Sequence, residues 1–122
     1  MPGNIESYRD LLVWQQAMDL AASTYETTRD WPKEELYGLT SQTRRAAVSI
    51  AANIAEGYGR ENRGSYQQFL RIAQGSLKEL ETHLLLAERT RIAPEGSTRD
   101  LLERCDSLGK LLRLLIRKLA ST

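Results

Sequence analysis

Apolar side chains recur at intervals of three and four residues along most of the chain, which is the spacing of amphipathic α-helices. The first such stripe starts at about Tyr8 and includes Val13, Ala17 and Leu20. Trp31-Pro32 follows it, and the residue before a proline is pushed out of helical geometry. We therefore expect a first helix from about Tyr8 to Trp31-Pro32.

The next stripe predicts a second helix that begins near Glu35 or Leu39 and ends at Glu56. Its inward face starts with Leu36 and continues at helical spacing. Gly57-Tyr58-Gly59 comes next, and glycine tolerates the left-handed geometry that ends many helices. We expect the second helix to stop at this glycine pair.

A third, longer helix is predicted from near Ser65 to about Arg91. Its length would be roughly 40 Å, which indicates a rod-like molecule. Gly75-Ser76 lies in its middle, where glycine lowers helix propensity, so we expect a tight helix crossing or a slight bend there. The loop at Ile92–Ser97 then reverses the chain.

The fourth helix is expected to open at Ser97 or Thr98. Its apolar positions alternate steps of four and three, the pattern of helices packed at shallow angles. These positions are Leu101, Cys105, Leu108, Leu112, Leu115 and Leu119. Four helices joined by short connections predict an all-α, antiparallel up-and-down four-helix bundle that forms a single domain of residues 1–122.

Composition places this bundle among ordinary globular proteins. Apolar residues make up 41% and charged residues 27% of the 122 residues. No apolar run approaches the roughly 18 residues that cross a bilayer, so we expect no membrane association. The first residues carry no recognisable secretory signal, and the single Cys105 fits a reducing compartment. Together these features predict a cytoplasmic location.

Charge is distributed unevenly although the formal net charge is only +1. Residues 1–43 carry three basic and seven acidic side chains, whereas residues 44–78 carry six and two. Residues 99–122 carry six basic and three acidic side chains. Arginine, which supplies most of the positive charge, favours forked hydrogen bonds to carboxylate or phosphate. Salt bridges and phosphate binding both remain open interpretations of these basic segments.

Few residues suit catalysis or metal binding. His83 is the only histidine, and no second histidine or cysteine stands at metal-ligand spacing from it. Cys105 lies on the apolar stripe of the fourth helix and is interpreted as a small buried apolar group. Glu79, Glu81 and Glu88 are interpreted as a solvated face. We therefore expect a protein that is not an enzyme and has no cofactor and no metal.

A line of polar residues on the second helix is the most informative cluster in the sequence. It consists of Arg44, Arg45, Ser49, Asn53 and Glu56, followed by Arg60. One interpretation is a structural or interface network in which arginine contacts Glu56 and Asn53 satisfies nearby polar groups. The other is a polar binding surface at a subunit junction.

Two basic groups are candidates for contact with nucleic-acid phosphates. They comprise Arg60, Arg63 and Arg71 around the second loop, and Lys110, Arg113, Arg117 and Lys118 near the C-terminus. The second group also has a structural explanation, because cations stabilise the C-terminal end of a helix.

Several sequence blocks together resemble one known family. They are Val13-Trp14-Gln15, Tyr37-Gly38-Leu39-Thr40-Ser41-Gln42, Arg44-Arg45-Ala46-Ala47-Val48-Ser49-Ile50, Asn53-Ile54-Ala55-Glu56-Gly57 and Phe69-Leu70-Arg71-Ile72-Ala73-Gln74-Gly75-Ser76. In this order they resemble the four-helix-bundle family that includes proteins encoded in intervening sequences of 23S ribosomal RNA genes. The resemblance implies a left-handed up-and-down bundle that assembles as a homopentameric ring. A related branch, the accessory proteins of diversity-generating retroelements, pairs with a reverse transcriptase and binds nucleic acid.

Two roles follow as expectations. The first is a non-catalytic, oligomeric interaction or scaffold protein whose main partner is another copy of itself. The alternative is an accessory protein that binds RNA, or a nucleic-acid-associated protein, through basic surface on the oligomer.

Overall fold

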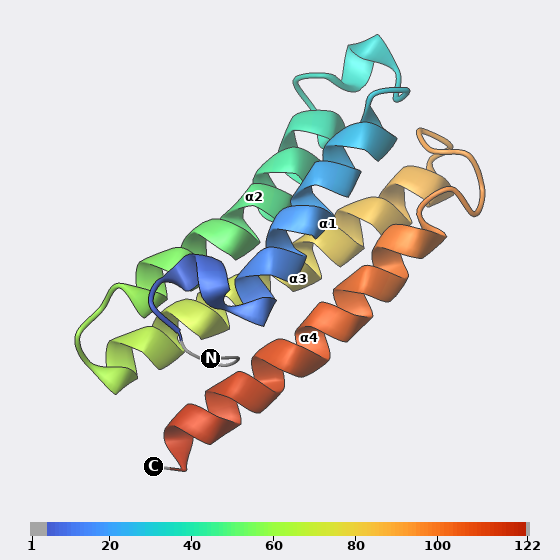
Figure 1. Cartoon of the computed structure of the whole chain (residues 1–122). Coiled ribbons are helices and arrows are strands. Elements are labelled where there is room, and N and C mark those ends of the chain that lie inside the picture. The colour runs from blue at the N-terminus through green and yellow to red at the C-terminus, as the bar shows by residue number, and fades with distance from the viewer. Residues whose placement is uncertain (1–4, 122) are drawn as a thin grey trace.

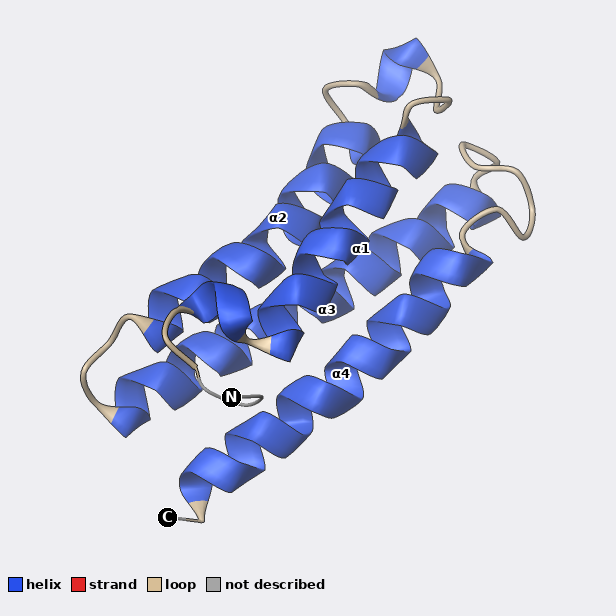
Figure 2. Ribbon diagram, viewed as in Figure 1, coloured by secondary structure: helices blue, strands red, loops and turns tan. Residues whose placement is uncertain are grey.

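The computed structural model describes residues 5–121, and within this range the chain is helical with no β-strand. Four long helices carry the fold, and two short 3-10 turns precede α1 and α2 (Figure 1, Figure 2). The elements are η1 (Tyr8–Asp10), α1 (Leu12–Thr28), η2 (Lys33–Glu35), α2 (Leu39–Tyr58), α3 (Arg63–Arg89) and α4 (Arg99–Ala120). The expected all-α architecture is thus confirmed for residues 5–121.

The four helices lie side by side and alternate in direction (Figure 1). Each helix packs against two others: α1 and α3 both contact α2 and α4. The α1–α2 groove and the α3–α4 groove therefore lie on opposite sides of the bundle. The α1–α2 and α3–α4 connections lie at the same end (Figure 1).

The buried apolar side chains form one cluster that draws on all four helices. Its largest fully buried members are Leu20, Ile50, Ile54, Leu70, Leu77, Leu80, Leu84, Leu101, Leu108 and Leu112. The stripe expected on α4 is confirmed from Leu101 to Leu112, and beyond it Ile116 is buried while Leu115 is only partly covered. Helical periodicity alone therefore located most of the core.

The first helix is shorter than expected at both ends. Ser7 and Asp10 cap a separate 3-10 turn, in which Ser7 Oγ accepts from Arg9 N at 3.0 Å and Asp10 Oδ2 accepts from Ser7 N at 3.1 Å. At the other end α1 stops at Thr28, and Trp31 is buried in the connection instead of extending the helix. The helix thus ends a turn before the residue that proline restricts.

Leu36 does not lie on the inward face of α2, contrary to the expectation. Its side chain is 44% exposed. The reason is local, because η2 ends at Glu35 and Gly38 departs from helical geometry before α2 begins at Leu39. Leu36 therefore belongs to the connection and faces outward.

The glycines after Glu56 act differently from the expectation. The second helix continues through Gly57 to Tyr58, and Gly59 has a right-handed backbone with φ of −74°. Gly57 instead allows α2 and α3 to approach, since a Cβ built on it would lie 2.7 Å from Phe69 Cβ. The left-handed expectation was therefore wrong, and Gly57 is a close-packing position.

The close helix contact expected at Gly75-Ser76 is made by Ser76 and not by Gly75. Gly75 is exposed, and an added Cβ there would meet no atom within 4 Å. Its neighbour Ser76 is buried and faces α2, where its hydroxyl lies 2.8 Å from that of Ser49. Gly57 provides a second close contact between α2 and α3.

Glu88, which was interpreted as part of a solvated face, also organises the connection between α3 and α4. Its carboxylate accepts from Gly96 N at 2.8 Å, from Thr98 N at 3.1 Å and from the Thr98 hydroxyl. The hydrogen bond from the Thr98 side chain, followed by that from Gly96, lowers the pKa of Glu88. A charged Glu88 therefore holds the loop that opens α4.

Replacing Gly57 by alanine should destabilise the protein, whereas the same change at Gly75 should not. We expect Gly57→Ala to lower the free energy of unfolding by about 1–2 kcal/mol, because the new methyl group must displace Phe69. Gly75→Ala should raise it by up to about 1 kcal/mol through helix propensity. Urea denaturation of both variants measures the two effects, and equal stabilisation by both would contradict the close packing at Gly57.

Candidate functional site

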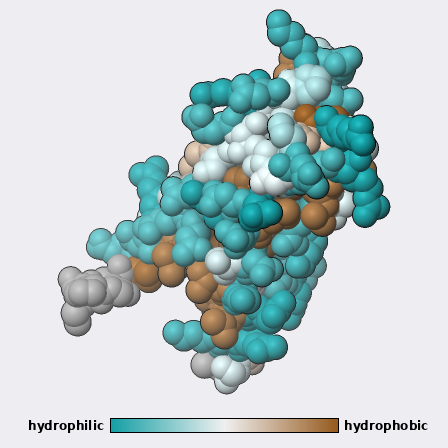
Figure 3. Space-filling view, turned by 90° about the vertical axis from the view of Figure 1, so that its right-hand side faces the viewer, coloured by the Kyte–Doolittle hydropathy of each residue, from teal (hydrophilic) through white to brown (hydrophobic). Residues whose placement is uncertain are grey.

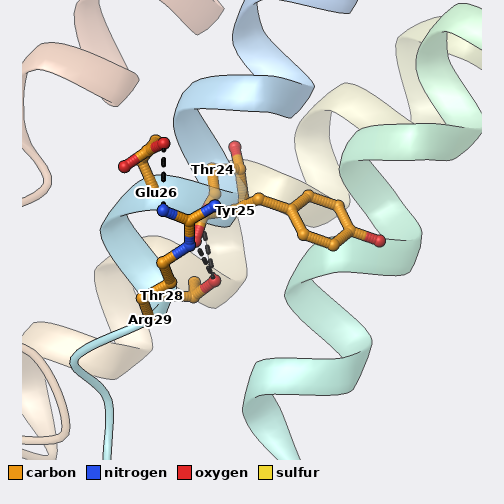
Figure 4. A network of polar contacts seen from close by, with 5 residues as sticks. All are labelled: Thr24, Tyr25, Glu26, Thr28 and Arg29. Carbon is orange, nitrogen blue, oxygen red and sulfur yellow. Dashed lines mark hydrogen bonds and ion pairs between the residues drawn. The ribbon is translucent and has the colours of Figure 1, made fainter.

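The polar line on α2 is divided into three separate groups in the structure. The first is centred on Arg44, whose Nε donates to Thr28 Oγ1 at 2.8 Å. The Arg44 guanidinium lies 4.9 Å from the centre of the Tyr25 ring. Thr28 donates in turn to Thr24 O at 2.8 Å, and Tyr25 extends from α1 towards α2 (Figure 4). Arg44 is therefore held in place between α1 and α2.

The second group links α2 to α3. The hydroxyl groups of Ser49 and Ser76 lie 2.8 Å apart. Asn53 Nδ2 donates to Ser49 O at 2.8 Å and to Ser49 Oγ at 3.0 Å. This part of the network is structural, as expected for Asn53, because it satisfies polar groups between two packed helices.

The third group contains Glu56, and Arg60 makes the expected arginine contact with it. Arg60 Nη2 lies 3.7 Å from Glu56 Oε1, and both side chains are about half exposed. Arg60 also lies over the Phe69 ring, 4.8 Å from its centre. Arg44 and Arg45 do not reach Glu56, since Arg45 is three helical turns, roughly 16 Å, away along α2.

Arg45 lies in a groove between α1 and α2 that we name the arginine groove. The groove has a volume of about 500 Å³. The residues that define it are Tyr25, Leu36, Tyr37, Arg44, Arg45 and Val48. Its four large apolar side chains are exposed, Tyr37 to 94%. Within residues 5–121, neither arginine has a carboxylate within ion-pair distance.

A second groove lies between α3 and α4, and we name it the acidic groove. Its volume is about 920 Å³. Carboxylates line it at Glu81, Glu88, Glu95, Glu103 and Asp106. Leu85 and Leu102 contribute apolar surface, and Arg99 is the basic residue of the lining. The two grooves thus carry opposite charge on opposite sides of the bundle.

The structure brings the two basic groups together, although they are distant in the sequence. Arg60, Arg63, Arg71, Lys110, Arg113, Arg117 and Lys118 are all exposed. The start of α3 meets the end of α4 where Gln67 Nε2 donates to Ile116 O at 3.3 Å. Six of the candidates therefore lie towards the end of the bundle opposite the α3–α4 connection, and Lys110 lies at the middle of α4 (Figure 1).

The charge of that end differs from the rest of the described chain. Residues 5–15, 53–74 and 107–121 carry eight basic and four acidic side chains, a net charge of +4. The remaining described residues carry nine basic and twelve acidic side chains, a net charge of −3. The bundle is therefore electrically polarised along its length.

The residues considered for chemistry are poorly placed for it. Cys105 is fully buried, and burial, followed by repulsion from Glu81, raises the pKa of its thiol to about 12. His83 is partly buried on α3. The described residues contain no cluster of three or more metal-binding side chains, and none of the described helices is both long and apolar enough to cross a membrane.

Sequence reasoning missed the residues that shape the arginine groove. Thr28 and Tyr25 showed only helical spacing, and their contacts with Arg44 cross the α1–α2 connection. Tyr37 gave one usable signal for the groove. It stands beside Gly38, where the helical pattern is interrupted, and an aromatic side chain in such a connection can be exposed.

The family model of the 23S rRNA-intervening sequence protein matches residues 9–114, which include most of all four helices. The chain belongs to this family. Both grooves lie within the region that matches the family. This match confirms the resemblance noted in the sequence. It does not test the homopentameric ring that the resemblance implies.

A crystal structure of a family relative shares the fold. It is that of a protein of unknown function from the S23 ribosomal protein family of Bacteroides thetaiotaomicron, with a TM-score of 0.77 and 23% sequence identity. The similarity covers 86% of this chain and 98% of that one. No curated protein matches this chain. At this identity the relative supports the fold and does not assign a function.

The buried thiol gives a test of the interpretation of Cys105. Because its pKa is raised in the folded state, its contribution to stability is fully present below about pH 8.5, the ordinary thiol value, and declines as pH rises towards about 12. We expect very slow alkylation at pH 8 without denaturant. The stability difference between the unaltered protein and Cys105→Ala should shrink above about pH 9. Rapid alkylation of the folded protein would contradict a buried thiol.

Proposed function

We propose that the protein is a non-catalytic interaction protein that works as a homo-oligomer. The arginine groove carries this proposal. It exposes four large apolar side chains beside two guanidinium groups that have no carboxylate partner among residues 5–121. Tyrosine and arginine are enriched at the centres of protein interfaces, and clustered exposed apolar surface is typical of contact sites.

Other exposed apolar side chains also favour a protein whose surface is covered by partner molecules. They include Met18, Ile72, Leu85 and Leu86, which are 44–58% exposed. The space-filling view shows apolar surface between polar side chains on one side of the bundle (Figure 3). Single exposed residues are normal, so the proposal rests mainly on the arginine groove, where four exposed apolar side chains lie together.

The absence of catalysis is part of the proposal. Its support is the protonated, buried state of Cys105 and the lack of a second imidazole for His83. A nucleophile needs a base or a lowered pKa to act at neutral pH, and Cys105 has the opposite shift. The homopentameric ring and the cytoplasmic location remain expectations from the sequence.

Nucleic-acid binding is the second candidate, and the basic end of the bundle favours it. Six exposed basic side chains, including Arg63 and Arg117, lie towards that end. In an oligomer this basic end would be repeated. Several copies could then contact one nucleic acid together, and its overall affinity would exceed that of the weak phosphate contacts of a single copy. The competing explanation is helix capping, since Arg117 and Lys118 lie in the last turn of α4.

Native mass spectrometry tests the proposed oligomer. We expect a mass that is a multiple of 13.8 kDa and a shift towards the single chain in Tyr37→Ser, because this change removes the most exposed aromatic side chain of the arginine groove. Leu114→Ser is the matched control, since Leu114 is exposed on α4 outside both grooves.

A single-chain mass at all protein concentrations would contradict the proposed homo-oligomer. Adding a single-stranded RNA at low salt separates the two candidate functions. Complexes that form at low salt and are lost as salt rises would favour nucleic-acid binding. An oligomer whose mass does not change with RNA would favour the interaction protein.

A further inference from the structure

We propose that the arginine groove of one copy docks on the acidic groove of the next copy. This inference rests on the proposed homo-oligomer and names the two surfaces that form its interface. The two surfaces differ, so the contact is heterologous: each copy offers one groove to one neighbour and the other groove to a second neighbour.

The charges of the two grooves are complementary. Arg44 and Arg45 have no carboxylate partner among residues 5–121. In the acidic groove, Glu81 pairs with Lys78 at 3.0 Å and Glu88 is engaged by the α3–α4 loop. Three carboxylates without an ion-pair partner in the described chain remain, at Glu95, Glu103 and Asp106. Complementary charge of this kind fixes register and favours the correct partner.

The apolar surfaces of the two grooves also match. Tyr25, Tyr37 and Val48 are exposed around the arginines. Leu85 is 58% exposed in the acidic groove, beside partly buried Leu102. Contact between these side chains would bury apolar area inside a charged rim, which is the usual anatomy of a protein interface.

The position of the grooves determines how the copies align. Residues near the α1–α2 and α3–α4 connections line them, and these connections lie at the same end of the bundle (Figure 1). The two grooves are on opposite sides, because each lies between a different pair of helices. Two copies that join them can lie side by side along their whole length only if their helices point the same way. An opposite orientation would leave most of each bundle beyond the contact.

A second copy suits the arginine groove better than a polyanion does. The acidic groove presents Leu85 and Leu102 together with its carboxylates, so it matches both the arginines and the exposed apolar side chains of the arginine groove. A chain of phosphates would match the arginines alone. Charge and apolar surface together therefore favour the acidic groove as the occupant.

Charge exchange tests the docking directly. The first variant is Arg45→Glu, and the second is Glu103→Arg together with Asp106→Arg. Arg44 is left unchanged because it is bonded to Thr28. Each variant alone should assemble only at protein concentrations about tenfold higher or more, since each places like charges across the contact. As a control, Arg9→Glu reverses an exposed charge outside both grooves and should leave assembly unchanged.

A chain that carries all three substitutions should restore the original mass, because the charges then match at every contact. Mixing the two variants should give complexes that contain both, although a ring with an odd number of copies cannot alternate them throughout. Restoration also excludes misfolding as the cause of the loss. An oligomer that survives both reversals would overturn the docking and leave the proposed homo-oligomer intact. An unaltered protein that remains a single chain would overturn both. Loss without restoration would contradict pairing between these two grooves.

Discussion

The close approach of α2 to α3 is the contact on which the rest of the bundle depends. Gly57 lies against Phe69 with no room for a side chain, and the paired hydroxyl groups of Ser49 and Ser76 bridge the same two helices. Small buried residues, among them Ala47 and Ala73, belong to the same helices. Helices with small facing residues can lie close together, which increases dispersion contact along their length.

The outer surfaces follow from this arrangement. The helices α1 and α4 pack on either side of the α2–α3 pair, and their contact with each other closes the bundle. Arg44 joins α2 to the end of α1 through Thr28, and Glu88 holds the loop that positions α4. The α1–α2 connection places Tyr37 in the arginine groove, and the α3–α4 connection places Glu95 in the acidic groove. Residues that secure the fold therefore also set the position of the charged surfaces.

The sequence predicted the parts of the structure that depend on local periodicity. Leu101 to Leu112 could be assigned to the core because burial follows the helical repeat. Leu36 could not, since its exposure depends on a turn that ends before α2 begins. The role of Glu88 and the pairing of Arg44 with Thr28 depend on contacts across loops, which spacing along one helix does not reveal.

The candidate site was predictable only in part. Arg44 and Arg45 stood out as charged residues in a helix rich in small side chains. The expected arginine contact with Glu56 exists, but Arg60 makes it, because Arg44 and Arg45 lie too far away along α2. The convergence of Arg63 with Arg117 required the antiparallel placement of α3 and α4. The acidic groove had no sequence signal beyond scattered carboxylates, since its two walls come from different helices.

Native-state hydrogen exchange, resolved by residue, tests the central role of the α2–α3 contact most directly. Amides in cooperative units that open last exchange slowest. We expect the slowest exchange in the middle of α2 and α3, around Ile50 and Leu77, and faster exchange along α4. Equal or greater protection of α4 would contradict it, because the bundle would then depend on all four helices alike.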